Sequence, residues 1–372
     1  MATDKRGRKL PKGIQQRYNG YEARPMIDGK RYLIHGKTIA EVQKQVTDLK
    51  YKLAHGLFVD KKKITFGEWF NTWMKEYKEG RIKAGTLAAY QKYYNGCITE
   101  RFGNVYINDI RGEHVQRLYN DLVKEEYAVS SIKVVSAVLN GCFSQAMKNG
   151  LIERNPINAA TLPRQTEKKS RQALTKEQQE LFMEYAKESY LYNMFAIMLR
   201  TGMRSGEVRG LKYIDIDKKK NVIHVQRTLK YLEHKGFFED TPKTHTSKRD
   251  IPLTKDTLAI LEEQRLFWKF DIVKLDRYLF CNENGDPLSR ERVQGEIDRT
   301  IRRIHGAGYE FDRITSHVFR HTFATRAIEA GMQPQVLKTI LGHSSLAMTM
   351  DLYSHVMEDI KADEMEKIES AF

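Results

Sequence analysis

The sequence has little cysteine, and its three thiols, Cys97, Cys142 and Cys281, are far apart and form no C-x-x-C pair. This spacing argues against a disulfide framework and a zinc ribbon, so we expect the thiols to pack in the interior. Long apolar runs are also missing. None approaches the roughly 20 residues of a membrane-spanning helix, and the N-terminal stretch MATDKRGRKLPKG has no signal-peptide core. We therefore expect a soluble protein of the cytoplasm without a membrane partner.

Acidic residues are in deficit, with 48 Asp and Glu against 63 Lys and Arg, which gives a formal charge of +15 and a pI of about 9.4. Such an excess is typical of proteins that bind nucleic acid, and an anionic membrane surface is the competing partner. Residues 1–60 hold 13 Lys and Arg against 6 Asp and Glu, so +7 of this charge lies in the first sixth of the chain. The length of 372 residues predicts two or three domains.

A metal centre is not indicated either. His317 and His321 are four residues apart, as in zinc proteases, but the residue after His317 is not the required glutamate. Arg320, a permanent cation, also lies between these two histidines. Asp215 and Asp217 resemble paired metal-binding carboxylates, but an acidic turn between a helix and a strand explains them more simply. We assign no metal and no cofactor.

The stretch TSHVFRHTFATRAIEAG, residues 315–331, predicts a helix that Thr315 or Ser316 caps and Gly331 ends. The predicted buried stripe of this helix is Phe319, Phe323 and Ala327. Residues three apart share a face of a helix, so His317 and Arg320 should point the same way. A phosphate would suit such a pair of cationic groups, although ordinary structural residues explain this stretch, taken alone, equally well.

Residues 1–60 predict a small three-stranded antiparallel sheet followed by a helix. Asn19-Gly20 and Asp28-Gly29 are hairpin turn signals, and Thr38 with Glu41 forms a capping box. The apolar face of the helix is Val42, Val46, Leu49 and Leu53. A basic three-stranded sheet can lay one face into a DNA groove, and the alternative is a small domain with a solvated basic face.

Residues 64–162 are predicted to be all-helical. Thr65 and Glu68 form a second capping box at the start of an aromatic-rich helix, which we expect to be core and not a base-stacking surface. The aromatic and apolar residues of this helix are Trp69, Phe70, Trp73, Met74 and Tyr77. Further helices are expected in residues 84–98, 111–125 and 130–150. Residues 163–173 are polar and basic and predict an interdomain linker.

Residues 174–372 alternate predicted helices with short strands, such as NVIHVQRTL and KRDIPL. A largely helical stretch is expected to end near Gly202. Polar residues recur in this part of the chain within short motifs, namely T-G-x-R-x-G-E, H-x-x-R-H and L-G-H, with a tyrosine about ten residues further on. The residues in this series are Arg204, Lys243, His317, Arg320, His343 and Tyr353.

These motifs, in this order and spacing, resemble those of the tyrosine recombinase (phage-type integrase) family. Each motif alone is weak, but the resemblance covers nearly the whole chain. Within this family, the chain is similar to integrases of conjugative transposons and Gram-positive phages, which carry an N-terminal arm-binding domain. The resemblance implies a multidomain α+β fold with an arm-type DNA-binding domain (1–60), a helical SAM-like core-binding domain (64–162), a linker (163–173) and a mainly helical catalytic domain (174–372).

The same resemblance implies that the six residues surround one scissile DNA phosphate, with Tyr353 as the nucleophile. Arg204 and Arg320 are suited to clamp the phosphate, and Glu207 could orient the guanidinium of Arg204. A tyrosine hydroxyl has an ordinary pKa of about 10 and must lose its proton as it attacks, and His317 is the expected acceptor.

His343 is expected to donate a hydrogen bond to the phosphate, although a structural histidine at a helix stop is an alternative. Lys243 is placed as general acid for the leaving 5′ oxygen by resemblance only. Lys248 and Arg249 lie nearby, so a cationic turn that touches the DNA backbone would look similar.

The expected function is that of a site-specific DNA recombinase that integrates, and is also expected to excise, a mobile genetic element through a 3′-phosphotyrosyl intermediate without metal or ATP. The alternatives are a type IB topoisomerase-like enzyme, a non-catalytic DNA-binding regulator and a metal-dependent nuclease. The expected partners are double-stranded DNA at core-type and arm-type sites, three further protomers in a homotetramer, and an excisionase or host DNA-bending protein. The C-terminal tail should form a short amphipathic helix that packs on a neighbouring protomer or on its own domain.

Overall fold

The computed structural model describes residues 9–54, 64–164, 173–233, 235–240, 248–269 and 276–353. The chain divides into two compact units, Met1–Lys168 and Lys169–Phe372. Both units combine helices with small antiparallel sheets, so the predicted α+β class is confirmed. The finer division into four segments stays a prediction. Within the described ranges, no helix is long and apolar enough to cross a membrane.

The N-terminal sheet contains the three antiparallel strands β1 (Ile14–Arg17), β2 (Gly20–Ala23) and β5 (Ile34–Gly36), in the order β1-β2-β5. The predicted three-stranded sheet is therefore confirmed. The intervening β3 (Met26–Ile27) and β4 (Lys30–Arg31) form a separate hairpin. Asp28 and Gly29 at its turn have φ values of 47° and 76°, as a two-residue turn with both φ angles positive requires.

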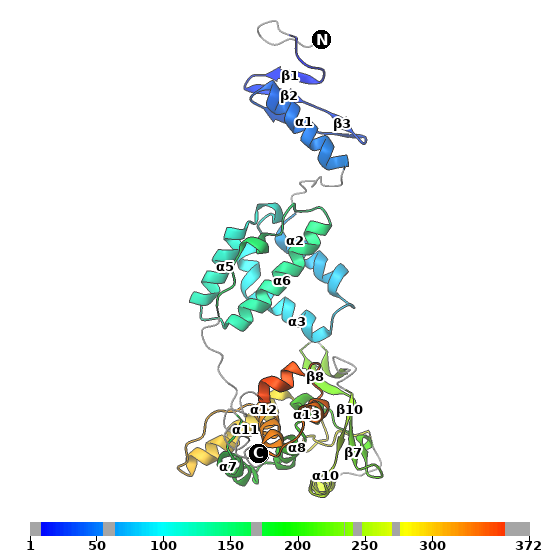
Figure 1. The fold of residues 1–372 in the computed structure, drawn as a ribbon, viewed down its shortest axis with the longest axis vertical. Coiled ribbons are helices and arrows are strands. Elements are labelled where there is room, and N and C mark those ends of the chain that lie inside the picture. The colour runs from blue at the N-terminus through cyan, green and yellow to red at the C-terminus, as the bar shows by residue number, and fades with distance from the viewer. Residues whose placement is uncertain are drawn as a thin grey trace, which may run out of the picture. The chain divides into compact units, whose positions relative to one another are not determined.

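Helix α1 (Ile39–Ala54) covers this sheet (Figure 1). Thr38 Oγ1 accepts a hydrogen bond from the Glu41 N–H at 3.2 Å, as the predicted capping box requires. The Glu41 carboxylate accepts from the Lys37 N–H at 2.8 Å, so the reciprocal bond is made one residue earlier than in the usual box. The buried core of this part is Ile14, Ala23, Ile34 and Val42.

Residues 64–162 of the first unit are mainly helical, as predicted. The α-helices of this range are α2 (Phe66–Trp73), α3 (Ala84–Tyr93), α4 (Thr99–Phe102), α5 (Gly112–Lys124) and α6 (Val129–Lys148). The other helices of this range are the π-helices η1 (Met74–Lys78) and η2 (Tyr94–Ile98) and the 3₁₀-helices η3 (Ile107–Asp109) and η4 (Pro156–Ala159). Both hydrogen bonds of the predicted Thr65–Glu68 capping box are present.

The aromatic residues of α2 form the core of this helical part, which confirms their predicted packing role. The ring of Phe70 stacks on Tyr94 with centroids 3.8 Å apart, and Trp73 stacks on Tyr90 at 5.9 Å. Gly141 on α6 lets Trp73 approach, because a Cβ atom there would lie 2.9 Å from the indole ring. All three cysteines of the chain are buried, as expected.

The second unit contains seven α-helices among the residues described. They are α7 (Lys176–Ala186), α8 (Tyr192–Thr201), α9 (Ser205–Arg209), α10 (Lys255–Phe267), α11 (Arg290–Gly306), α12 (Ser316–Glu329) and α13 (Pro334–Leu341). The stretch expected to be largely helical up to Gly202 is two helices, α7 and α8, separated by residues 187–191. Ser189 in this break donates a hydrogen bond from its hydroxyl to the buried Glu296 on α11 at 2.7 Å.

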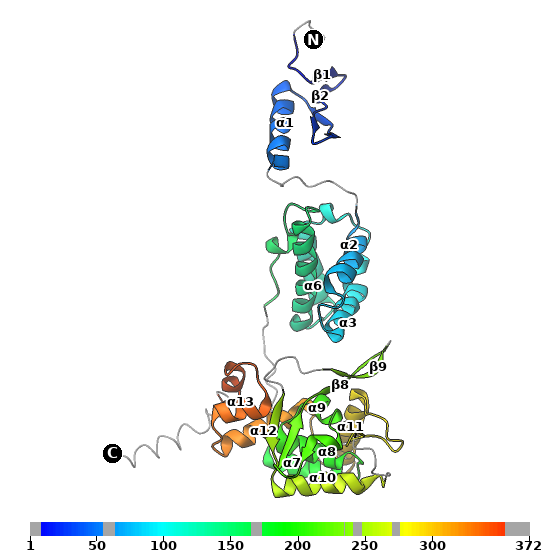
Figure 2. The ribbon, with the colours of Figure 1, turned by 90° about the vertical axis from the view of Figure 1, so that its right-hand side faces the viewer.

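The strands of the second unit form two small antiparallel sheets. β6 (Ile216–Asp217), β7 (Val222–Val225) and β10 (Arg249–Pro252) pair in the order β10-β7-β6. β8 (Thr228–Leu232) and β9 (Gly236–Asp240) form a hairpin that extends from this unit (Figure 2). The short helix η5 (Tyr213–Asp215) precedes β6.

The core of the second unit surrounds α8, whose residues Met194, Phe195, Ile197 and Met198 are fully buried. α8 ends at Gly202, which has a left-handed φ of 62°. A Cβ atom there would lie 2.4 Å from the Phe323 ring, so only glycine fits. The predicted helix at residues 315–331 is α12, which begins after Thr315 and ends before Gly331. The tight end of α8 thus brings the start of α9 close to α12.

Candidate active site

Arg204 lies at the N-cap of α9, directly after the left-handed Gly202 turn. Its Nη1 donates to Glu207 Oε1 at 2.8 Å, and its backbone N–H donates to Glu207 Oε2 at 2.9 Å. The predicted orientation of Arg204 by Glu207 is therefore present. The Arg204 side chain is 34% exposed while that of Glu207 is 2% exposed, so the arginine reaches solvent over a buried carboxylate.

Arg320 lies on α12 and is 8% exposed. Its Nη1 donates to the Gly202 carbonyl at 2.8 Å, and its Nη2 donates to the Leu341 carbonyl at 2.7 Å. Burial, followed by the charge of Arg204, lowers the pKa of Arg320 to about 9. Arg320 is therefore fixed by two backbone carbonyls at a site that already holds another guanidinium.

His343 follows Gly342 at the end of α13 and is 7% exposed. Its Nδ1 lies 2.9 Å from the Thr349 hydroxyl. Burial, and then the charges of Arg320 and Arg204, lower the pKa of His343 to about 4. The imidazole is therefore neutral near pH 7.

Arg249 is the residue that sequence reasoning missed, because KRDIPL suggested a cationic turn at the surface. The structure buries its side chain to 3% exposure. Arg249 donates from Nη1 to Glu207 Oε1 at 3.2 Å and from Nη2 to Glu207 Oε2 at 2.9 Å. Strand alternation was a usable signal, since Arg249 and the buried Ile251 lie on the same face of β10.

Glu207 is the carboxylate that Arg204 and Arg249 share. Burial alone would raise its pKa, but the charges of Arg249 and Arg204 outweigh burial and hold the pKa of Glu207 below its usual range. The site thus holds three guanidiniums and one ionised carboxylate, which pairs with Arg204 and Arg249 and acts on Arg320 through its charge.

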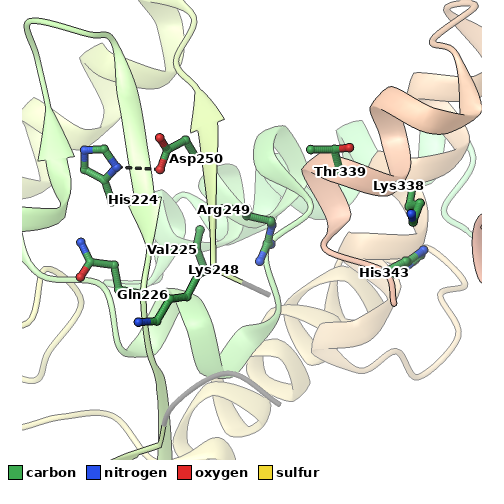
Figure 3. A pocket seen from close by; sticks show the side chains of 9 residues that line it. All are labelled: His224, Val225, Gln226, Lys248, Arg249, Asp250, Lys338, Thr339 and His343. Carbon is green, nitrogen blue, oxygen red and sulfur yellow. Dashed lines mark hydrogen bonds and ion pairs between the residues drawn. The ribbon is translucent and has the colours of Figure 1, made fainter. Parts of the chain in front are cut away.

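A cavity of about 600 Å³ opens beside this cluster. Figure 3 shows the strand residues on one side, α13 and His343 on the other, and Arg249 between them. The cavity is lined by His224, Val225, Gln226, Lys248, Arg249, Asp250, Lys338, Thr339 and His343. His224 Nδ1 and Asp250 Oδ1 are 2.7 Å apart. Lys248 and Lys338 line this cavity and the buried guanidinium of Arg249 adds positive charge beside it, so the cavity suits an anion.

Three predicted site residues are not placed in this cluster. Lys243 lies outside the described residues. His317 is exposed at the start of α12. Tyr353 is buried, and its hydroxyl donates to the Met332 carbonyl. Burial raises the pKa of Tyr353, so its hydroxyl keeps its proton in this arrangement.

Tyr353 packs in a small apolar cluster at the end of the described chain. The buried neighbours in this cluster are Ala324, Ala327, Ile328, Leu337 and Leu341. Within the described ranges, no group of three His, Cys, Asp or Glu side chains gathers as a metal site would require.

Comparison with known proteins assigns the family. Residues 172–359 match the phage integrase family, and residues 65–123 match the N-terminal SAM-like domain of phage integrases. The chain is 27% identical over 362 residues to a tyrosine recombinase XerC-like protein of Caldanaerobacter subterraneus subsp. tengcongensis, covering 91% of each chain.

Two solved structures share the fold. The Tn1549 transposon integrase in complex with a circular intermediate DNA has a TM-score of 0.71 and 25% identity, over 82% of this chain and 99% of that one. The lambda integrase tetramer bound to a Holliday junction has a TM-score of 0.59 and 21% identity, over 93% and 95% of the two chains.

The family match spans half of the sequence and includes the arginine cluster, so the chain belongs to the phage integrase family. The predicted enzyme class, a tyrosine site-specific recombinase of the phage and conjugative-transposon type, is confirmed. A topoisomerase-like enzyme and a non-catalytic regulator are not favoured.

Proposed function

We propose that this recombinase integrates a mobile genetic element, and also excises it, by cutting and rejoining duplex DNA at single phosphodiesters without metal or ATP. The observation that supports this most strongly is the charge of the site. Arg204 and Arg249 share the carboxylate of Glu207, and Arg320 adds a third guanidinium to the site, beside a neutral His343. A phosphodiester would neutralise part of this excess positive charge.

Arg204 and Arg320 are proposed as the phosphate clamp. Negative charge spreads over the equatorial oxygens of the phosphate as the nucleophile arrives, so donors fixed beforehand stabilise the transition state without reorganisation. Arg320 is fixed by two carbonyls and Arg204 by Glu207. The neutral His343 is proposed to donate a hydrogen bond from Nε2, with Nδ1 accepting from the Thr349 hydroxyl.

Tyr353 is proposed as the nucleophile. Its Oη forms a bond to phosphorus while the bond from phosphorus to the 5′ oxygen breaks, which leaves a 3′-phosphotyrosyl link and a 5′ hydroxyl. The tyrosine proton passes to His317, and Lys243 protonates the leaving oxygen. A 5′ hydroxyl of a partner duplex then attacks the link and restores a phosphodiester, so no external energy is needed. Tyr353 must first give up its hydrogen bond to the Met332 carbonyl.

The proposed partners are those expected for a member of the phage integrase family. Residues 64–162 would hold core-type DNA sites and residues 1–60 arm-type sites, and four protomers would act together on the synapsed DNA. This tetramer is supported by the fold shared with the lambda integrase, which forms one on a Holliday junction. An excisionase or a host DNA-bending protein is proposed as an accessory partner, and the bacterial cytoplasm as the location.

The test is incubation with a nicked suicide duplex that carries the core site of the element, because loss of the short nicked fragment traps the covalent intermediate. We expect a protein–DNA adduct that resists denaturation and forms equally well in the presence of a chelator. An adduct that needs a divalent ion, or cleavage without an adduct, would contradict the proposal. Relaxation of plasmids that lack the site would favour the topoisomerase-like alternative.

A further inference from the structure

The end of α13 collects the three arginines of the site. A helix leaves its last carbonyls without partners inside the helix, and the negative end of its dipole attracts cations. Here the backbone N–H groups of Gly342 and His343 donate to the carbonyls of Thr339 and Lys338, respectively. The next three carbonyls accept from arginines, in the pairs Ile340 with Arg249, Leu341 with Arg320, and Gly342 with Arg204.

These three arginines come from three separate elements. Arg204 caps α9, Arg249 begins β10 and Arg320 lies on α12. The three consecutive carbonyls of residues 340–342, at the end of α13, therefore set the spacing of the three guanidiniums. His343, the next residue along the chain, is held at the same point.

The hydrogen bonds and the exposure of Arg249 set it apart from the other two arginines. All three of its guanidinium nitrogens already donate, Nη1 and Nη2 to the two oxygens of Glu207 and Nε to Ile340. Its side chain is 3% exposed, against 34% for that of Arg204. It also fills the space beneath Gly342, where a Cβ atom would lie 3.1 Å from its Cδ. Arg249 is therefore arranged to hold other groups and not to meet a phosphate itself.

We infer that Arg249 is a positioning residue for cleavage, which locks Glu207 against Arg204 and the end of α13 against β10. Through Glu207 it fixes the exposed guanidinium of Arg204. Through Ile340 it fixes the carbonyls that hold Arg320 and the turn that carries His343. The inference rests on the proposed phosphate clamp and adds a residue to its support. Misplacing a reacting group by about 1 Å can cost about 100-fold in rate.

The test is single-turnover cleavage of the suicide duplex by the full-length chain at saturating DNA, with the rate and the final adduct yield measured separately. We expect Arg249→Met to lower the rate about 100-fold, with DNA affinity within about twofold of the original and with the folded fraction still reaching full adduct yield. Arg249→Lys keeps the charge but loses the paired bonds to Glu207, so its rate should be intermediate.

Arg209 offers a matched control, because it is also a buried arginine of this unit, at the end of α9. It donates to the backbone carbonyls of Leu288 and Leu229. We expect Arg209→Met to lower thermal stability and the yield of active protein while the folded fraction cleaves at the original rate.

A double-mutant cycle with Glu207→Gln separates positioning from general destabilisation. If Arg249 acts through Glu207, the double variant should cleave about as slowly as the slower single variant, because both changes break the same ion pair. An Arg249→Met rate within twofold of the original, or rate losses that simply multiply in the double variant, would overturn the inference. Both of these results overturn the role of Arg249 but leave the proposed function intact, provided that the original protein forms the adduct. If the original protein forms no adduct, the proposed function itself is contradicted.

Discussion

The imidazole of His343 is buried beside Arg204, Arg249 and Arg320, and these neighbours decide its protonation state. The pKa of His343 falls to about 4, below its ordinary 6.5. Between these two values the unfolded chain binds the proton more readily than the folded chain does. The contribution of His343 to stability is therefore present above pH 6.5 and is lost as the pH falls toward 4.

We predict that the free energy of unfolding decreases from pH 6.5 toward pH 4, with His343 contributing up to about 1.4 kcal/mol per pH unit. The measurement is urea unfolding across this range for the original protein and for His343→Asn. The other histidines titrate in both proteins, so the difference between the two slopes isolates His343. Equal slopes would show that His343 is not held neutral in the folded state.

Sequence reasoning predicted single residues well where the interaction is local. Arg204 and Glu207 are three positions apart at a helix start, so their pairing follows from the helix alone. The burial of Arg249 depends on α9 and α13, which are distant in sequence, and its four-residue strand gives only a short alternating pattern. The bond from Tyr353 to Met332 is likewise a tertiary contact that no spacing rule predicts.

At the scale of elements, the end of α13 links the fold to the site. Gly342 there has a φ of 65°, and a Cβ atom on it would lie 3.1 to 3.3 Å from the Arg249 side chain. Gly331, after α12, has a φ of 78°, but a Cβ atom on it would have nothing within 4 Å. The two glycines share the left-handed conformation and differ in their surroundings.

We predict that Gly342→Ala and Gly331→Ala each lose about 1 kcal/mol or more of stability, the cost of a left-handed non-glycine residue. Only Gly342→Ala should also slow cleavage, because its methyl group displaces the Arg249 guanidinium. Thermal unfolding and single-turnover cleavage of both variants provide the comparison. Equal cleavage rates for the two variants would mean that the turn tolerates the displacement.

The existence of α2 was predictable because the Thr65 cap is a local signal. The helix α12 was also predicted, but its N-cap residue Thr315 makes no side-chain cap hydrogen bond, so the expected cap by Thr315 is wrong. The break between α7 and α8 was missed, since it depends on a long-range bond from Ser189 to Glu296. The β3–β4 hairpin was also missed as a separate element. Its turn at Asp28-Gly29 was correctly placed, but which strands pair is a tertiary choice.

At the scale of the whole molecule, residues 1–60 carry +7 of the +15 charge and none of the proposed catalytic residues. Their described part has its own small core around Val42. We predict that deleting residues 1–60 removes binding to arm-type DNA and weakens the dependence of DNA binding on salt, because fewer phosphates are neutralised. Cleavage of the core-site suicide duplex should be spared. Gel shifts on both kinds of site test this, and a folded truncated protein that binds every site unchanged would contradict the arm-binding assignment.

The predicted C-terminal helix, which packs on a neighbouring protomer or on its own domain, concerns residues 354–372. These lie outside the described residues, so both alternatives stay predictions. Packing on a neighbouring protomer bears on Tyr353, because a partner that engages the following segment could free the tyrosine from the Met332 carbonyl.

The central claim is that Tyr353 forms the covalent link to DNA, and protease digestion of the suicide-substrate adduct followed by mass spectrometry tests it most directly. We predict a nucleotide remnant on the oxygen of Tyr353, and a Tyr353→Phe variant that binds the duplex with unchanged affinity but forms no adduct. A remnant on any other residue, or an adduct formed by Tyr353→Phe, would contradict the account.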